Sequence, residues 1–215
     1  MSGKIVYFLF AVFGLTYTAN LGKEKRCDGF RANFSMNTIM GTWYVVAIIP
    51  KNVLSEYEEE VVCYKVDFSE TDVAGLKWLA NRTLNHPHKE VLDRINGTIV
   101  RQRYHIDPPY DVWSKSVEGV SGCFQEVFSL DMNSTNRSKE FDAMMQIHLF
   151  EKSNEPFLLQ MLWGKVISVV VYSRRENVDT TQLKDISDVV TDLRGPQQKP
   201  RICGRSVKDL MQSKP

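Results

Sequence analysis

The feature that most constrains the fold is a series of short β-strand patterns between residues 41 and 173. These segments are rich in Val, Ile, Tyr, Phe, Trp and Thr, and several alternate apolar and polar residues with a period of two. Turn signals containing Pro, Gly, Asn and Asp separate them. Eight strands joined in series by mostly short connections favour an all-β up-and-down antiparallel barrel or a sandwich. The predicted strands cover residues 41–49, 59–69, 74–84, 91–105, 122–132, 140–150, 156–163 and 166–174.

One α-helix is predicted after the strands. Thr180 or Thr181 can cap its start, and Gly195-Pro196 is typical of a helix end. Because the apolar residues in between recur at helical spacing, we expect them to pack against the barrel wall. These residues are Leu183, Ile186, Val189, Val190 and Leu193.

The N-terminus carries an apolar run over residues 5–15, directly after Lys4. A run of this length fits the core of a secretory signal peptide better than a membrane span, which needs about 20 residues. Small residues at Thr18 and Ala19 predict cleavage near residues 18–22, and an uncleaved anchor is the alternative. We therefore expect a secreted, extracellular chain without a transmembrane segment. The expected organisation is a signal peptide at 1–20, one domain at 21–205 and a tail at 206–215.

Charge, cysteines and glycosylation sequons are consistent with secretion. A net charge of +1 gives no electrostatic reason to expect nucleic acid or an anionic membrane as a partner. Four cysteines make an even number, which favours two disulfides in an oxidising compartment, and they lack the C-x-x-C spacing of a zinc site. Five N-x-S/T sequons predict glycosylation at Asn33, Asn81, Asn96, Asn133 and Asn136, although the last two are too close together to favour joint occupancy.

Strand alternation indicates which side chains could line a cavity. A glycan on Asn81 would have to face water, which turns the neighbouring Leu76 and Trp78 inward. The strand over 156–163 is apolar on both faces, so its inward residues are harder to assign. A core completely filled by side chains is the alternative to a cavity. The predicted ligand-binding residues are Tyr64, Val66, Phe68, Leu76, Trp78, Phe141, Met145, Ile147, Met161 and Trp163.

Two short motifs flank the strand series. The first strand begins Met40-Gly41-Thr42-Trp43, in which Gly41 allows a bend and Trp43 is large enough to plug one end of a barrel. The last strand ends Val171-Tyr172-Ser173-Arg174. In position and order these motifs resemble the G-x-W signature and the C-terminal strand of the lipocalins. A Thr-Asp-Tyr-like turn typical of the family is not recognisable at residues 153–157.

The resemblance has structural implications. It implies an eight-stranded barrel, with relatives among insect-type and apolipoprotein D-like lipocalins. It also implies that Arg174, or alternatively Arg175, lies against Trp43, where a guanidinium over an indole is favourable; two exposed arginines in a turn are the other interpretation. The implied disulfides are Cys63–Cys203 and Cys27–Cys123.

The functional implication is transport of a small hydrophobic ligand, such as a lipid, a retinoid, a pigment or a pheromone-like molecule. The chain has no G-x-S-x-G, H-E-x-x-H or phosphate-loop motif, so we expect no enzyme, cofactor or metal. Haem binding through a histidine is an alternative, but His86 and His88 lie in a predicted turn and His148 is predicted to face outward.

A second alternative is a secreted interaction or inhibitor protein that acts through its loops. The long predicted connection from Asp107 to Ser121 would then expose Tyr110 and Trp113 to a partner. The sequence does not identify any receptor at the cell surface. An open apolar cavity would favour the carrier, and a filled barrel would favour the interaction protein.

Overall fold

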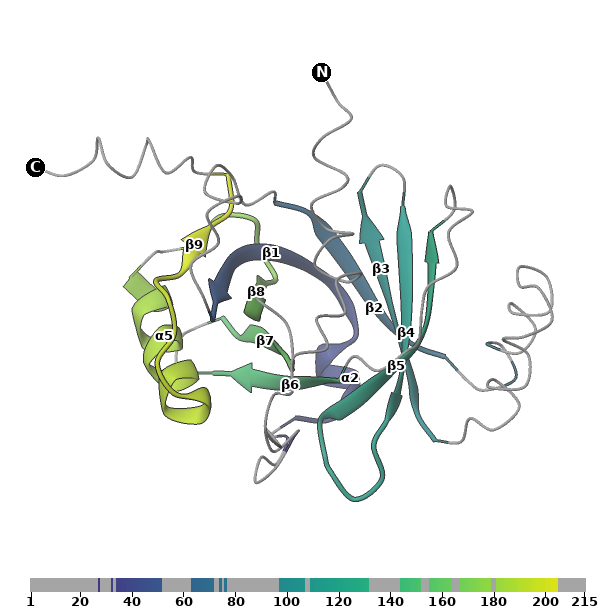
Figure 1. The fold of residues 1–215 in the computed structure, drawn as a ribbon. Coiled ribbons are helices and arrows are strands. Elements are labelled where there is room, and N and C mark those ends of the chain that lie inside the picture. The colour runs from purple at the N-terminus through teal and green to yellow at the C-terminus, as the bar shows by residue number, and fades with distance from the viewer. Residues whose placement is uncertain are drawn as a thin grey trace, which may run out of the picture.

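Eight antiparallel strands close into a barrel (Figure 1). Each strand from β2 to β8 pairs with the next along the chain, β8 pairs with β1, and the pairing of β1 with β2 completes the ring. The barrel strands are β1 Gly41–Pro50, β2 Lys65–Thr71, β3 Ile99–His105, β4 Tyr110–Ser116, β5 Cys123–Asp131, β6 Met144–Phe150, β7 Phe157–Leu162 and β8 Ile167–Ser173. This computed structural model describes residues 27, 32, 34–51, 63–71, 74, 76, 97–106, 109–131, 144–151, 155–163, 167–178 and 181–204. The up-and-down barrel expected from the sequence is confirmed.

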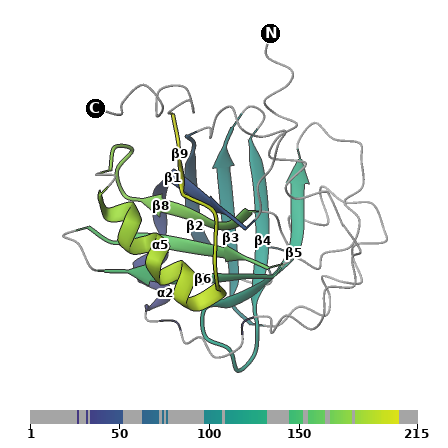
Figure 2. The ribbon, with the colours of Figure 1, turned by 60° about the vertical axis from the view of Figure 1, so that its left-hand side comes forward.

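Three further elements accompany the barrel. The short helix α2, Met36–Ile39, precedes β1, and the strand β9, Arg201–Ile202, pairs with β1. The helix α5, Thr181–Arg194, lies along the outside of the barrel (Figure 2). The predicted C-terminal helix is therefore confirmed. None of the helices in the described part of the chain is long and apolar enough to cross a bilayer.

The packed face of α5 is narrower than the predicted apolar stripe. Leu183, Ile186 and Val190 are buried, whereas Leu193 is 40% exposed. Gly195 follows the helix with φ of +77°, and its amide donates to the carbonyl of Thr191 at 2.8 Å. A glycine at this position satisfies a terminal carbonyl without side-chain strain.

Two elements were predicted wrongly. Ala74 and Leu76 are helical, so the predicted strand over 74–84 is not formed at its described residues. Conversely, β4 occupies the segment that we had expected to be a long loop. The alternation of β4 is hard to recognise because the strand contains the polar residues Asp111, Ser114 and Lys115. Ser114 in particular lies on the inward face, where an apolar side chain was expected.

Buried apolar side chains form two clusters on opposite faces of the barrel wall. The inner cluster fills the barrel and includes Trp43, Phe68, Phe124 and Leu149. The outer cluster lies between α5 and the outward faces of β1, β6, β7 and β8. Because α5 covers these strands from outside, they are buried on both faces, which explains their continuous apolar sequences.

Two disulfides connect distant parts of the chain. Cys27 is bonded to Cys123 at the start of β5, with their Cα atoms 6.0 Å apart. Cys63, two residues before β2, is bonded to Cys203, directly after β9, with a Cα separation of 5.0 Å. Both pairings are those that the resemblance implied. Cross-links over 96 and 140 residues restrict the unfolded chain strongly and therefore stabilise the fold.

Candidate ligand-binding site

One end of the barrel is closed by Trp43. Its indole is fully buried, and its Nε1–H donates to the carbonyl of Ile39 in α2 at 2.8 Å. This bond satisfies the polar atom of the indole while its rings fill the base of the barrel. The guanidinium of Arg174 lies 3.7 Å from the centroid of the same indole, within the range of a cation–π interaction.

Arg174 also binds the backbone that leads into β1. Its Nη1 donates to the carbonyl of Thr42 at 2.8 Å, and its Nη2 donates to the carbonyls of Thr38 and Met40, each at 2.9 Å. Burial lowers the pKa of Arg174 from its ordinary value, although the group stays charged at neutral pH. Arg175 is exposed and forms an ion pair with Glu155 instead.

Gly41 permits this close packing. Its φ is +94°, a conformation that other residues rarely adopt, and a Cβ there would lie 3.3 Å from Nη1 of Arg174. Gly41, Trp43 and Arg174 therefore form one unit that closes the base, which we call the closed end.

The solvent exposure of inward side chains increases away from the closed end. Trp43, Leu149 and Leu158 are at most 1% exposed. Ile48 and Tyr110, which lie toward the other end of β1 and β4, are each 9% exposed. Met145, Leu162 and Val170 have intermediate values of 4%, 5% and 6%. The inner side chains with the highest exposed fractions therefore lie toward the end opposite Trp43, which we call the open half.

A buried polar network crosses the interior. The side chain of Gln102 in β3 donates to Oε1 of Gln160 in β7 at 3.1 Å. The hydroxyl of Tyr172 donates to the same oxygen at 2.6 Å, and the hydroxyl of Tyr104 donates to Gln102 at 3.1 Å. Gln160 also approaches the sulfur of Met145 at 3.1 Å. Each amide or hydroxyl here has a partner, so the network orients side chains from three strands in a low-dielectric interior.

Three tyrosines form a row: Tyr64 directly precedes β2, Tyr104 lies in β3 and Tyr110 begins β4. The ring centroids of Tyr64 and Tyr104 are 5.8 Å apart, and those of Tyr104 and Tyr110 are 6.1 Å apart. Burial raises the pKa of Tyr64 and, with the neighbouring Tyr64, that of Tyr104. Their hydroxyls therefore stay neutral at neutral pH, and the row offers aromatic surface together with hydrogen-bonding groups.

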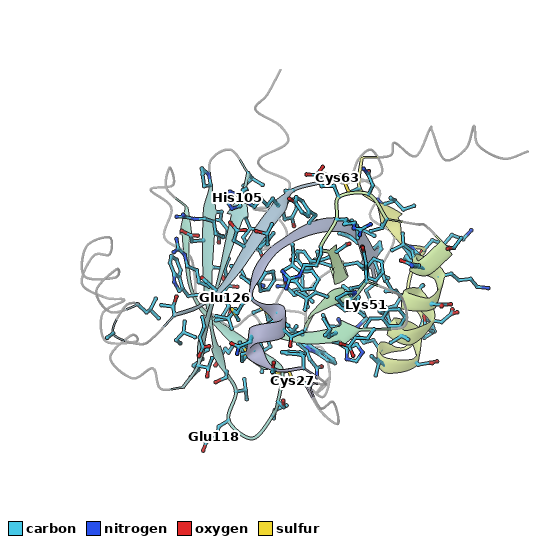
Figure 3. All side chains as sticks on the ribbon, turned by 180° about the vertical axis from the view of Figure 1, so that it is seen from behind. Cys27, Lys51, Cys63, His105, Glu118 and Glu126 are labelled. Atoms are coloured by element: carbon cyan, nitrogen blue, oxygen red, sulfur yellow. A yellow bond between two sulfur atoms is a disulfide. The ribbon has the colours of Figure 1, made fainter. Side chains whose placement is uncertain are left out.

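An acidic side chain also faces the interior. Glu126 in β5 lies opposite Ser114, and residues directly opposite in an antiparallel pair share one face of the sheet. That face is the inner one, because Ser114 is two residues from Val112 and Glu126 is two residues from Phe124, both in the inner cluster. Glu126 nevertheless keeps partial solvent exposure (Figure 3 labels it).

This polar interior was hard to predict from sequence patterns alone. The one sequence feature that indicates an inward Glu126 is its spacing of two residues from Phe124. Beyond Glu126, a register shift between Trp113 and Ser114 interrupts the regular pairing of β5 with β4, so alternation along β5 could not be followed further. Gln102 and Gln160 are each 1–2% exposed and were overlooked because glutamine is usually a surface residue.

The structure places five of the predicted ligand-binding residues in or against the inner cluster. Val66, Phe68, Met145 and Ile147 belong to it, and Tyr64 packs against it. Leu76 is buried at 1% exposure. Trp78 and Phe141 lie outside the described residues.

Met161 and Trp163 do not face the interior, so their prediction as cavity residues was wrong. Met161 belongs to the outer cluster beneath α5. The indole of Trp163 lies 4.3 Å from the guanidinium carbon of Arg194 at the end of the same helix. The error arose because β7 is apolar on both faces, and Gln160, the polar residue of that strand, is the one that points inward.

At residues 110–116, a strand stands where an exposed loop for a partner protein was expected. Tyr110 is 9% exposed and points inward, and Trp113 is 1% exposed and packs beside Arg101 on the outer face of β4. The prediction that both are exposed was wrong, because β4 is a strand.

The described histidines lie on the outer face of the barrel. The Nε2 of His105 lies 2.5 Å from Oδ2 of Asp67 on the neighbouring strand. His148 alternates with the inner residues Ile147 and Leu149, and its partial burial lowers its pKa. No group of three His, Cys, Asp or Glu side chains suited to a metal is found among the residues that the structure covers. His86 and His88 lie outside them, as do all five predicted glycosylation sites, the predicted signal peptide and the predicted tail.

Comparisons with known proteins find similarity at the level of solved structures. No family model and no curated protein matches the sequence. The major cockroach allergen Per a 4 is 9% identical with a TM-score of 0.43, over 81% of this chain and 90% of the allergen. A biogenic amine-binding protein is 11% identical with a TM-score of 0.40, over 77% of this chain and 79% of the other. The amine-binding protein of Rhodnius prolixus, solved with tryptamine, is 11% identical with a TM-score of 0.41, over 84% and 90% of the two chains.

Proposed function

We propose that this protein binds and carries a small, largely apolar molecule in the open half of its barrel. The observation that supports this most strongly is the change in exposure along the interior, from at most 1% at Trp43, Leu149 and Leu158 to 9% at Ile48 and Tyr110. A barrel that is closed at one end and accessible at the other can admit a ligand while the packing at its closed end stays intact. The packed closed end keeps the strands in place while the open half remains available.

The chemistry of the interior supports binding of an apolar body with a few polar groups. Apolar side chains such as Val112, Met145 and Leu162 supply most of the wall, and burial of ligand surface against them contributes about 25 cal/mol per Å². About 300 Å² would give about 7.5 kcal/mol before the costs of association. The Gln102–Gln160 network offers a fixed set of hydrogen-bonding groups that can orient the ligand.

A carrier outside the cell, rather than an enzyme, accounts best for the chain as a whole. The four cysteines form two disulfides, which persist in oxidising compartments. The apolar run at residues 5–15 is typical of a secretory leader. Within the described interior, Gln102, Tyr104, Gln160 and Tyr172 bind each other, and no histidine stands beside a serine there as a nucleophile and base would.

Isothermal titration with the neutral probe N-phenylnaphthylamine tests the proposal. We expect saturable binding with one site per chain. Leu162→Trp, which enlarges a side chain in the open half, should weaken binding by at least about tenfold, or 1.4 kcal/mol. Leu193→Trp, the same change on the exposed side of α5, should bind as the unmodified protein does. Circular dichroism and thermal melts establish that both variants are folded.

The proposal fails if the unmodified protein binds no apolar probe of this size. It also fails if the folded Leu162→Trp variant binds as tightly as Leu193→Trp, because the ligand would then lie elsewhere.

A further inference from the structure

The two disulfides of the protein differ in their burial. Cys27 and Cys123, which are bonded to each other beside the β4–β5 turn, are 2% and 0% exposed. In the other disulfide, Cys63 is exposed and Cys203 is half-buried. Figure 3 labels Cys63 and Cys27 far apart, at the top and the bottom of the view. Because a thiolate must reach a sulfur atom to exchange with it, the exposed disulfide is the more open to reaction.

Gly204, directly after Cys203, leaves room beside the sulfur of Cys63. It is exposed and has φ of +70°, a conformation in which a glycine is strongly favoured. A Cβ at this position would lie 3.2 Å from Sγ of Cys63. Any larger residue here would therefore cover part of that sulfur. The glycine keeps the approach to it open.

The exposed disulfide closes a seam in the wall of the open half. The edge of β1 that faces away from β8 pairs with β2 over residues 41–44 and with β9 over residues 47–48. Between these two stretches, the amide of Cys203 donates to the carbonyl of Val46 at 3.0 Å. The bond from Cys63 to Cys203 therefore joins β2 to β9 at the point where β1 changes its partner.

The strand β9 is too short to stay in place through backbone hydrogen bonds alone. It consists of Arg201 and Ile202, and Ile202 packs against the outer cluster. Just before β9, the amide of Gln198 donates to the carbonyl of Pro50 at 3.0 Å. Since a single hydrogen bond contributes about 1 kcal/mol at most in net terms, a strand of two residues depends on a further restraint. The disulfide provides it.

We propose that Cys63–Cys203 is a redox-sensitive link, which a dithiol reduces while Cys27–Cys123 stays intact. A thiolate of the dithiol attacks Sγ of Cys63 and forms a bond to it. The bond to Cys203 breaks, and its electron pair leaves on Sγ of Cys203, which takes up a proton. The second thiol of the dithiol then attacks the mixed disulfide and releases Cys63 as a thiol. Two electrons and two protons thus pass to the two cysteines, and the dithiol is oxidised to a disulfide.

Reduction of this link releases β9 and opens the seam beside β1. Ile48, which pairs with Arg201 of β9, is an inner side chain of the open half with 9% exposure. Tyr64, directly after Cys63, belongs to the row of tyrosines and packs against the inner cluster. The opened seam therefore adjoins the open half, whereas the closed end is undisturbed. In a step that rests on the proposed function, a bound molecule then leaves the barrel faster.

Timed reduction of the unmodified protein tests the difference between the two disulfides. Samples of the folded protein in dithiothreitol are quenched with acid, unfolded and alkylated, and peptide mass spectrometry gives the redox state of each cysteine. We expect Cys63 and Cys203 to be reduced at least about tenfold faster than Cys27 and Cys123. Equal rates, or faster reduction of Cys27–Cys123, overturn the proposal.

Gly204→Ala tests the approach to the sulfur. The added methyl group should slow reduction of Cys63–Cys203 by roughly threefold. The matched control is Gly119→Ala, which carries the same backbone strain at φ of +76° but places its Cβ within 4 Å of no other atom. It should leave the rate unchanged. Equal rates in the two variants overturn the role of Gly204.

Hydrogen exchange tests the release of β9. Cys63→Ser combined with Cys203→Ser removes the link permanently, and amides in residues 198–204 should then exchange at least about tenfold faster. Amides of β6 and β7 should exchange as before. The unmodified protein held in dithiothreitol gives the same measurement if the variant does not fold. Unchanged exchange over residues 198–204 overturns the opening of the seam.

Release of the neutral probe N-phenylnaphthylamine separates this inference from the proposed function. Stopped-flow displacement should show release at least about threefold faster after reduction of Cys63–Cys203. If the probe binds but leaves at an unchanged rate, the carrier function stands and the effect on the open half is overturned. If the probe does not bind at all, the carrier function fails, and the reduction and exchange measurements still decide whether the link is redox-sensitive.

Discussion

The two ends of the barrel use the same strands for opposite purposes. β1 contributes Trp43 to the closed end and Ile48 to the open half, and β8 contributes Tyr172 and Val170 in the same way. At the closed end, Trp43 and Arg174 together donate hydrogen bonds to four backbone carbonyls, and the packing leaves inner side chains at most 2% exposed. In the open half, the inner side chains Ile48 and Tyr110 keep 9% exposure. With the proposed function, this comparison means that stability and binding are separated along the barrel axis.

The largest difference between the two ends is expected when Trp43, the plug of the closed end, is replaced. We expect Trp43→Ala to destabilise the protein by about 3–5 kcal/mol, because it leaves a large cavity at the base. Urea unfolding followed by circular dichroism measures the loss. Trp163→Ala is the matched control on the outer face, where the indole is partly exposed, and should cost about 1 kcal/mol. Equal losses at the two tryptophans would contradict the assignment of the closed end.

Removal of the guanidinium tests the closed end more finely. Arg174→Met keeps much of the side-chain volume but deprives three carbonyls of their donor, so we expect a loss of about 2–3 kcal/mol. Arg175→Met removes only an exposed ion pair with Glu155 and should cost at most about 0.5 kcal/mol. The same urea titrations compare the pair, and a larger effect at Arg175 would reverse the assignment.

The polar network should be less important for stability than the plug. Gln160→Leu removes the acceptor of Gln102 and Tyr172 and leaves both buried, so we expect a loss of about 1–2 kcal/mol in thermal or urea unfolding. Gln102→Leu in the same background should then add little, because the two amides bind each other. Fully additive losses would show that the network does not act as a unit.

The smallest expected effect is a pH dependence at the outer face. Partial burial alone would raise the pKa of Asp67, but hydrogen bonds from Thr42 and His105 outweigh it and hold the pKa below its ordinary value of 3.8. A carboxylate with a lowered pKa stabilises the fold above about pH 4, and this contribution disappears as the pH falls through the lowered value.

Asp67→Asn removes that contribution. The melting temperature of the variant should therefore fall less steeply below pH 4 than that of the unmodified protein. Asp111→Asn is not a suitable control because it breaks two arginine pairs, whereas the exposed Asp192 on α5 offers one. If the melting temperatures of Asp67→Asn and Asp192→Asn fall equally steeply below pH 4, this role of Asp67 is refuted.

Predictions from the sequence were reliable where short motifs supported a resemblance to a known family. The size of Trp43 indicated a plug, and the resemblance implied its Arg174 partner and both disulfides. Helix α5 could be predicted because its apolar residues recur at a regular period.

The sequence was a poorer guide where two faces of a strand are alike. Met161 and Trp163 were assigned to the interior because β7 is apolar on both faces, and the sequence does not reveal that α5 covers the outer one. Glu126 could not be recognised, since the register shift between β4 and β5 interrupts the period on which such an assignment depends. These failures come from tertiary contacts, which local patterns do not encode.

The most direct test of a barrel that holds its ligand opposite Trp43 is a crystal structure of the protein with N-phenylnaphthylamine. The account predicts electron density for the probe inside the barrel beside Leu162, with the Trp43–Arg174 contact intact. Density for the probe only on the outer surface, with side chains filling the barrel from end to end, would contradict it.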